Sequence, residues 1–282
     1  MSTFVDHLGA RIHYDRYLPD GEAHGVVQLA HGYAEHAGRY GRLIELLLAH
    51  GYAVYADDHR GHGRTGLEQF GGDASRLGRL GRGGVKAAIR SLGEFTDLIR
   101  AENPGLPLVL IGHSWGSFMA QILVNQRPTH YAAVVLSGTI LRQLGAANMG
   151  DLNARWNGPG ATGAEWLSPD PQTVAGFVDD PLCSMVPMQK NFGLLNQLRM
   201  MGLPSRSLPR DLPVLLVVGR DDPVGGPRSV HRLAEAYRGR AGLTDVTTLV
   251  YPGQRHEILN EESAAKPRED VVSWIDHRLS RA

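Results

Sequence analysis

Residues 106–117 read LPLVLIGHSWGS, an apolar run that ends in the pattern Gly112-x-Ser114-x-Gly116. Continuous apolar runs of this length are typical of strands buried on both faces of a parallel sheet. Apolar residues then follow at a spacing that predicts a helix: Trp115, Phe118, Ile122 and Leu123. A strand, a serine between two glycines and a helix form the setting of a nucleophile elbow, in which the glycines permit a sharp turn that lifts the serine above the sheet.

Short apolar runs elsewhere predict the other strands of the same sheet. Runs that fit strands buried on both faces lie at 26–30, 53–56, 132–136, 213–218 and 246–251. Residues 11–17 alternate in polarity, which predicts an exposed antiparallel strand at a sheet edge. Helical spacing of apolar residues occurs between these strands, at 42–50, 85–99, 230–237 and 271–279. This order predicts an α/β protein with right-handed crossovers and a mostly parallel, doubly wound central sheet flanked by helices.

The alternation of strands and helices stops between residues 139 and 208, a stretch rich in glycine, asparagine, proline and methionine. About seventy residues are too many for a simple loop in a compact domain. We therefore expect residues 1–138 and 209–282 to form the core. Residues 139–208 are expected to form an inserted, mainly helical lid, or cap.

The composition narrows the classes of function. The 282 residues carry 29 Lys+Arg and 29 Asp+Glu, so the formal charge is zero and no basic balance points to nucleic acid. The single cysteine, Cys183, can form neither an intramolecular disulfide nor a cysteine-based zinc cluster. The chain shows no signal-peptide pattern, no apolar stretch long enough to span a membrane and no histidine pair at HExxH spacing. We expect a cytoplasmic protein with no membrane span.

A serine hydroxyl is a weak nucleophile without a general base, and in one chain order that base lies downstream of the serine. Three histidines follow the predicted lid. His231 and His277 lie in predicted helices and are typical of solvated surface residues. His256 follows the predicted strand 246–251 behind a Pro-Gly turn, at the carboxyl end of the sheet, where ligands bind in such folds. His256 is therefore the candidate base for Ser114.

Two further parts of such a site have candidates in the loops. The carboxylate that orients the histidine is expected in VVGRDDPVGG (217–226), where spacing does not choose between Asp221 and Asp222. An oxyanion hole needs two backbone N–H groups. One is expected from Trp115, and the other from Tyr33, in the loop after strand 26–30.

The motifs together resemble the monoacylglycerol lipase and lysophospholipase branch of the α/β-hydrolase superfamily, which also contains the serine aminopeptidases. The matching segments are HGYAEHAGRY (31–40), DHRGHGRT (58–65), GHSWGS (112–117), GRDDPVGG (219–226) and YPGQRHEILNE (251–261), with WLSPDPQTVAGFVDDPLC (166–183) in the lid. The resemblance implies the α/β-hydrolase fold with an inserted helical lid.

The resemblance also assigns roles. It implies Ser114 as nucleophile, His256 as base and Asp222, rather than Asp221, as acid. Tyr33 and Trp115 match the oxyanion residues, although methionine often stands at the position of Trp115. No metal or cofactor is implied. His59 and His62, in the second matching segment, fit a loop-bracing role better than a catalytic one.

The implied activity is a serine ester hydrolase that cleaves a small, partly apolar carboxylic ester, such as a monoacylglycerol or lysophospholipid, through an acyl-enzyme. Methionine adapts to flexible chains, so the lid's apolar residues could line an acyl pocket, or they could simply pack the lid onto the sheet: Met185, Met188, Phe192, Leu194 and Leu195. An amidase or aminopeptidase, an acyltransferase and a non-catalytic binding protein are the alternatives. The lid's apolar rim could contact a membrane or lipid, or another subunit, and the oligomeric state stays open.

Overall fold

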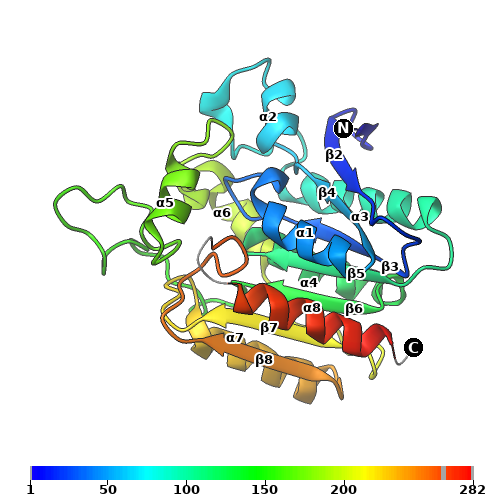
Figure 1. The fold of residues 1–282 in the computed structure, drawn as a ribbon. Coiled ribbons are helices and arrows are strands. Elements are labelled where there is room, and N and C mark those ends of the chain that lie inside the picture. Colours follow the sequence, from blue (N-terminus) through cyan, green and yellow to red (C-terminus); the bar gives the residue numbers. More distant parts are fainter. Residues whose placement is uncertain (1, 262–264, 281–282) are drawn as a thin grey trace.

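The computed structural model describes residues 2–261 and 265–280, and an eight-stranded sheet forms its centre (Figure 1). Residues 1, 262–264, 281 and 282 lie outside the described residues. They belong to the two segments that are expected to form the core, residues 1–138 and 209–282. The strand order is β1-β2-β4-β3-β5-β6-β7-β8. The strands are β1 (Ser2–Val5), β2 (Arg11–Tyr17), β3 (Gly25–Ala30), β4 (Tyr52–Asp57), β5 (Leu108–His113), β6 (Ala133–Ser137), β7 (Val214–Gly219) and β8 (Val246–Tyr251).

The buried strands hold the two sides of the molecule together because alternate residues point to opposite faces. Val26 and Leu110 face one apolar core, and their neighbours Val27 and Ile111 face the other. The helices that cover the first face are α3 (Gly84–Glu102), α4 (Trp115–Gln126) and α7 (Gly226–Glu235). The helices that cover the second face are α1 (Gly41–Ala49) and α8 (Lys266–Leu279), which lie in front of the sheet in Figure 1.

The expected mostly parallel sheet is confirmed. Strands β3 to β8 pair in parallel, and β2 pairs antiparallel with β4. The prediction that residues 11–17 form the edge strand is wrong, because the short strand β1 pairs with β2 and lies outside it. The prediction that residues 246–251 are buried on both faces is also wrong: β8 is the opposite edge, and its central residues are half-buried.

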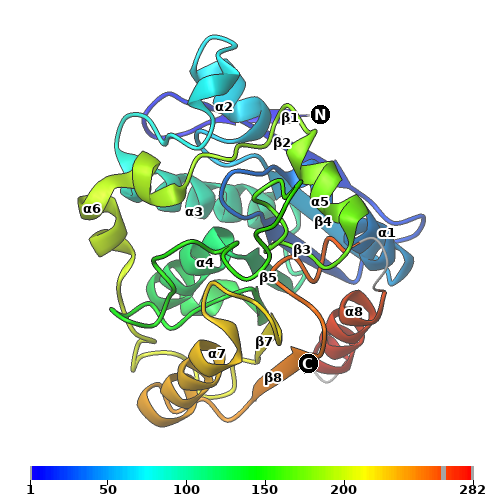
Figure 2. The ribbon, with the colours of Figure 1, turned by 90° about the vertical axis from the view of Figure 1, so that its left-hand side faces the viewer.

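The segment between β6 and β7 lies on one side of the molecule, which faces the viewer in Figure 2. It contains two α-helices, α5 (Pro171–Val178) and α6 (Met188–Met200), and the rest is turn and loop. The stretch is thus less helical than the sequence suggests. Helix α6 packs against α3 and α4, and it is kinked at Gly193, whose φ of 64° departs from helical geometry.

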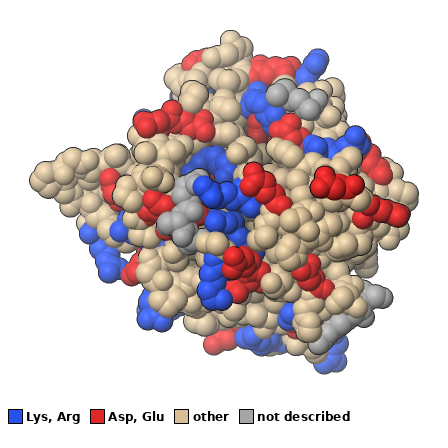
Figure 3. All heavy atoms as spheres, in the orientation of Figure 1, with Lys and Arg blue, Asp and Glu red and all other residues tan. Residues whose placement is uncertain are grey.

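The surface agrees with the balanced composition. On the face shown in Figure 3, basic and acidic side chains lie interspersed among uncharged ones. Within residues 2–261 and 265–280, every helix is too short or too polar to cross a membrane.

Candidate active site

Ser114 lies on a strained turn between β5 and α4. Its φ of 50° and ψ of −121° are rare for a residue with a side chain, and its N–H donates to Ser137 O at 2.9 Å. The flanking glycines permit the close packing that holds this turn. A Cβ on Gly116 would lie 2.2 Å from Ala30 O, and one on Gly112 would lie 2.8 Å from Gly116 O. The glycines are thus required by contact distance.

His256 and Asp222 form a buried pair at the carboxyl ends of β8 and β7. The imidazole Nδ1 lies 3.0 Å from Asp222 Oδ2, and both side chains are almost fully buried. The other oxygen, Asp222 Oδ1, accepts from Val224 N at 2.9 Å. Asp221, which the spacing left open as an alternative, points outward and pairs with Arg155 at 2.6 Å. The geometry therefore places Asp222, and not Asp221, against the histidine.

The His256 ring lies next to the turn that carries Ser114. His256 Nε2 is buried and has no hydrogen-bond partner among the described residues. The ring of His113, the residue before Ser114, lies 4.9 Å from the His256 ring. The backbone N–H of His256 donates to Leu167 O at 3.0 Å, so the segment between β6 and β7 also holds the histidine loop.

The charge environment of His256 favours its protonated form. Burial lowers the pKa of His256, but the charge and hydrogen bond of Asp222, with smaller contributions from Glu257 and Glu35, outweigh burial and raise the pKa above its usual value. A base with a raised pKa accepts a proton more readily. The pair is therefore suited to take a proton from a hydroxyl and to stabilise the resulting imidazolium.

Two backbone N–H groups beside Ser114 are available as donors. Trp115 N belongs to the first residue of α4, and Tyr33 N lies in the turn after β3; neither has an acceptor in the described part of the chain. A Cβ built on Gly32, next to Tyr33, would lie 3.2 Å from Ser114 Cβ, which places this turn against the serine. Free N–H groups beside a nucleophile are what an oxyanion intermediate requires.

A buried ion-pair network joins the loop after β3 to the loop after β8, and no sequence pattern predicted it. Arg39 donates to Glu257 through two hydrogen bonds of 2.6 and 2.7 Å, and to Glu35 Oε2 at 2.7 Å. Glu35 Oε1 accepts from Gly32 N at 2.5 Å and from Tyr40 Oη at 2.7 Å. The i, i+4 spacing of Glu35 and Arg39 was visible in the sequence, but the contact with Glu257 spans 218 positions.

Histidines of the second matching segment are buried beside Trp115 and act as packing groups. The His62 ring stacks on the Trp115 indole with centroids 4.9 Å apart, and its Nδ1 lies 2.9 Å from Arg60 O. Burial lowers the pKa of His62 to about 3, so its ring is neutral at neutral pH. His59 Nδ1 lies 2.9 Å from Asp57 Oδ2. Both histidines brace the loop after β4.

The five apolar lid candidates separate into two groups. Phe192 is buried, and Met188 packs against the same core. Leu194, Leu195 and Met185 are 72%, 61% and 48% exposed. The expectation that Leu194 and Leu195 line an acyl pocket is therefore not met in this structure, where both leucines lie on the surface of α6.

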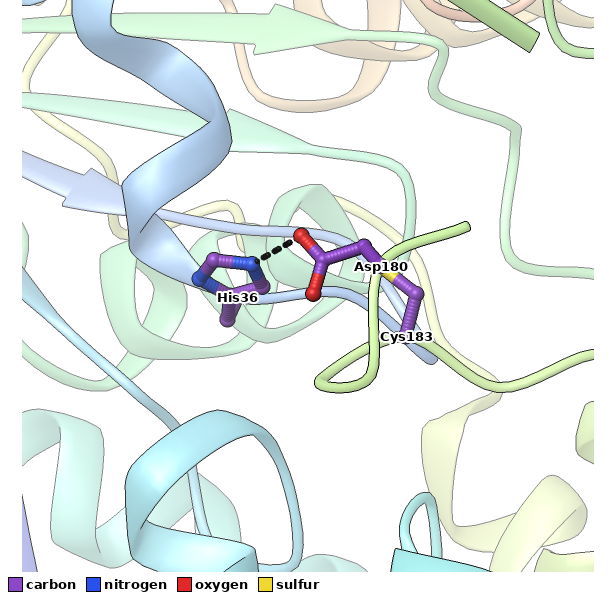
Figure 4. Close-up of side chains that lie close together, drawn as sticks. All are labelled: His36, Asp180 and Cys183. Atoms are coloured by element: carbon purple, nitrogen blue, oxygen red, sulfur yellow. Dashed lines mark hydrogen bonds and ion pairs between the residues drawn. The ribbon is translucent and has the colours of Figure 1, made fainter. Parts of the chain in front are cut away.

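Three potential metal ligands lie together where the loop after β3 meets the segment between β6 and β7 (Figure 4). Atoms of His36, Asp180 and Cys183 lie within 4.8 Å of one another. His36 Nδ1 accepts from Gly38 N at 3.2 Å, so a neutral ring carries its proton on Nε2, which donates to Asp180 Oδ2 at 2.8 Å. Burial also raises the pKa of the Cys183 thiol. His36 and Asp180 therefore form a hydrogen-bonded pair, with the Cys183 thiol beside them.

The parallel sheet, the strained serine turn and the His256–Asp222 pair together define an α/β-hydrolase. The chain belongs to the serine aminopeptidase S33 family, whose family model matches residues 21–263. It is 35% identical over 297 aligned residues to a monoacylglycerol lipase of Mycolicibacterium smegmatis, covering 98% of this chain and 97% of that protein.

Solved structures agree with this assignment. A carboxyl esterase from Bacillus coagulans, in complex with glycerol, superposes with a TM-score of 0.85 at 25% identity, covering 99% of this chain and 98% of that one. The monoacylglycerol lipase of Paleococcus ferrophilus superposes with a TM-score of 0.69 at 26% identity, covering 96% and 99%.

Replacing Asp222 with asparagine should lower the pKa of His256, because burial remains and the main influence that raises the pKa is lost. Activity that needs neutral His256 rises as pH increases through its pKa, so the acidic limb of the pH–rate profile should move to lower pH in Asp222→Asn. The rate at the plateau should fall by up to about 10⁴-fold, because the imidazole loses the carboxylate that orients it. An unchanged acidic limb in kcat/KM would contradict this assignment.

Replacing Arg39 with methionine should destabilise the protein by about 3–5 kcal/mol, because Glu35 and Glu257 stay buried without their cation. The matched control is Arg90→Met, which breaks the exposed i, i+4 pair with Glu94 and should change stability by less than about 0.5 kcal/mol. Urea denaturation measures both. Equal losses in the two variants would show that the buried network contributes no more than a surface pair.

Proposed function

We propose that this protein hydrolyses the ester bond of monoacylglycerols through an acyl-enzyme formed on Ser114. The observation that carries this proposal is the arrangement of one strained serine beside the buried His256–Asp222 pair and two free backbone N–H groups. These parts follow four strands of the sheet: β3, β5, β7 and β8. An arrangement of this kind performs acyl transfer in serine hydrolases of unrelated folds.

In the first half of the proposed reaction, Ser114 Oγ attacks the ester carbonyl while His256 Nε2 accepts the hydroxyl proton. Asp222 holds the imidazole through Nδ1 and stabilises its positive charge. The N–H groups of Tyr33 and Trp115 donate to the carbonyl oxygen as it becomes negative. The imidazolium then gives its proton to the leaving alkoxide, which departs as the glycerol alcohol and leaves the acyl group on Ser114.

In the second half, a water molecule takes the position of the alcohol. His256 removes a proton from this water as it attacks the acyl-enzyme, and the same two N–H groups stabilise the second oxyanion. Collapse of that intermediate breaks the bond to Ser114 Oγ, which regains its proton from His256. The products are a fatty acid and glycerol, and the enzyme returns to its starting state.

The substrate class is supported by the relatives. The 35% identical protein from Mycolicibacterium smegmatis is a monoacylglycerol lipase, and its match covers nearly all of both chains. The carboxyl esterase from Bacillus coagulans carries glycerol, the alcohol that a monoacylglycerol would release. A carboxylic-ester hydrolase that acts on monoacylglycerol-type substrates accounts for the chemistry of the site and for these similarities.

Aminopeptidase activity is the alternative that the family description raises. Such an enzyme needs a free carboxylate to bind the substrate's ammonium group. At this site Glu35 and Glu257 are both bound to Arg39, and Asp222 is bound to His256. The buried carboxylates around His256 are thus already neutralised, which favours an uncharged ester over an amine substrate.

Residues 139–208 are proposed to act as the cap over this site and to meet lipid. Leu167 holds the histidine loop through its carbonyl oxygen. Three leucines on α6 are exposed: Leu194 and Leu195, as given above, and Leu198 at 49%. Exposed apolar groups that cluster on one element commonly mark an interaction site, and a dispersed long-chain ester presents a matching apolar surface.

The test of the proposed activity compares wild type with Ser114→Ala on a p-nitrophenyl ester series, on a monoacylglycerol and on an aminoacyl-anilide. Wild type should hydrolyse the esters and release fatty acid, while Ser114→Ala should be slower by about 10⁶-fold. Covalent labelling by a fluorophosphonate should be lost in the variant. Faster turnover of the anilide than of every ester would support the aminopeptidase alternative, and absence of labelling in wild type would contradict a nucleophilic serine.

Replacing both Leu194 and Leu195 with serine tests the lipid contact. Because each leucine loses a favourable apolar contact, the double variant should lose about tenfold more activity on dispersed long-chain monoacylglycerol than on a soluble butyrate ester. Arg199→Ser, at an exposed polar position of the same helix, is the matched control. A ratio of the two rates equal to that of wild type would exclude these leucines as the lipid contact.

A further inference from the structure

The loop HGYAEH (31–36) contains Tyr33, whose N–H is one of the proposed oxyanion donors. Its residues contact two different parts of the molecule, the Arg39 network and the segment between β6 and β7. Glu35 points to the core and joins the Arg39 network. Three of its neighbours, Tyr33, Ala34 and His36, bind the segment between β6 and β7 instead. Ala34 O accepts from Ser184 N at 2.9 Å, and His36 donates to Asp180 at 2.8 Å (Figure 4).

The third neighbour, Tyr33, is attached through its phenol. Tyr33 Oη donates to Val186 O at 2.8 Å and accepts from Asn191 Nδ2 at 2.8 Å, so its donor and one acceptor position are both used. Burial raises the pKa of Tyr33 to about 12, which keeps the phenol protonated at neutral pH. A Cβ on Gly78 would lie 2.7 Å from Tyr33 Oη and 2.8 Å from Asn191 Nδ2, so a glycine is needed there to leave space for the bond.

One side chain of α6 contacts both residues that carry the proposed oxyanion donors. Phe192 is 4% exposed and packs edge-on against the Tyr33 ring, with centroids 5.3 Å apart. It also packs edge-on against the Trp115 indole, again at 5.3 Å. Tilted contacts at this separation are the favourable geometry for aromatic pairs. Asn191 and Phe192 are consecutive in sequence, so a single turn of α6 touches both donor residues.

We infer that α6 positions the oxyanion donors through Asn191 and Phe192, so that the cap must be docked for the transition state to be stabilised. The inference rests on the proposed function of Tyr33 and Trp115. A displacement of α6 would release the Tyr33 phenol and remove the ring between the two donor residues. Asn191 and Phe192 are thus positioning residues, which act through Tyr33 and Trp115 without touching the reacting atoms.

Tyr33→Phe and Asn191→Ala test the phenol contact with a soluble ester, p-nitrophenyl butyrate. Removal of an oxyanion donor costs about 10²–10³-fold in rate, and a loosened donor should cost less, about tenfold in kcat. KM should stay within about twofold, because the lost interaction forms only in the transition state. The affinity of a boronic acid inhibitor, which mimics the tetrahedral intermediate, should fall by the same factor as kcat/KM.

The matched control is Gln189→Ala, on the same helix. Gln189 is exposed, and its side chain makes no hydrogen bond with the described residues. This variant should keep kcat and the boronate affinity within about twofold of wild type. The double variant Tyr33→Phe/Asn191→Ala should lose less than the sum of the two single losses, because the hydrogen bond between Tyr33 and Asn191 is removed by either change.

Fluorophosphonate labelling at completion counts competent sites in every variant and separates a slower site from a misfolded one. Tyr33→Phe keeps the ring and its packing, so it remains informative should Asn191→Ala fold poorly. Full kcat in Tyr33→Phe, additive losses in the double variant, or an equal loss in Gln189→Ala would each overturn the inference. If wild type fails to hydrolyse any ester, the proposed function fails instead, and the boronate comparison has no starting value.

Discussion

Arg39 is the group on which the geometry of this site depends. Its guanidinium joins Glu35, in the loop after β3, to Glu257, in the loop after β8. In the sheet these two strands are separated by β5, β6 and β7, so backbone pairing does not bring their loops together directly. A buried charge is tolerated only when it is paired with an opposite charge. The two loops are therefore held in the arrangement in which Arg39 pairs with both Glu35 and Glu257. In that arrangement Gly32 N donates a hydrogen bond to Glu35, and Glu257 is the residue that directly follows His256.

The same region stores backbone strain. Ser114 and Ala34 are the non-glycine residues with positive φ in the described part of the chain, at 50° and 63°. Each residue in such a conformation costs on the order of 1–3 kcal/mol of folding free energy, and the conformation persists only where surrounding contacts enforce it. At Ser114 the enforcing contacts come from the core, through Ser137 O and the close approach of Gly116 to β3. At Ala34 they include a hydrogen bond from Ser184, which belongs to the proposed cap.

Much of the fold could be predicted because it depends on local patterns. Apolar runs marked the strands from β3 to β8, as expected for strands of a mostly parallel sheet, and the alternating polarity of residues 11–17 marked β2. The strand β1 and the short helix α2 (Gly63–Gln69) were missed. The four residues of β1 are largely exposed and carry no burial pattern, and α2 has glycine at two positions and only one apolar residue besides them.

The sequence predicted the positions of some site residues better than those of others. Ser114 and His256 follow strands, so their side of the sheet could be expected from sequence. Asp221 and Asp222 are adjacent, so their spacing did not choose between them; the family resemblance implied Asp222, and Asp222 is the one that faces the histidine. Leu194 and Leu195 follow Gly193, where α6 kinks, so helical periodicity no longer predicts which way they point. The long-range contacts of Glu257 leave no local pattern at all.

Trp115 shows how these constraints combine. Its indole is completely buried between His62 and Phe192, so it contacts both the loop after β4 and helix α6. Its backbone N–H, by contrast, is free beside Ser114. A large side chain here fills the space between the loop after β4 and α6, and a smaller residue would leave Phe192 in contact with the Tyr33 ring alone. The side chain therefore contacts α6, while the backbone N–H is the part of Trp115 that we propose meets the substrate.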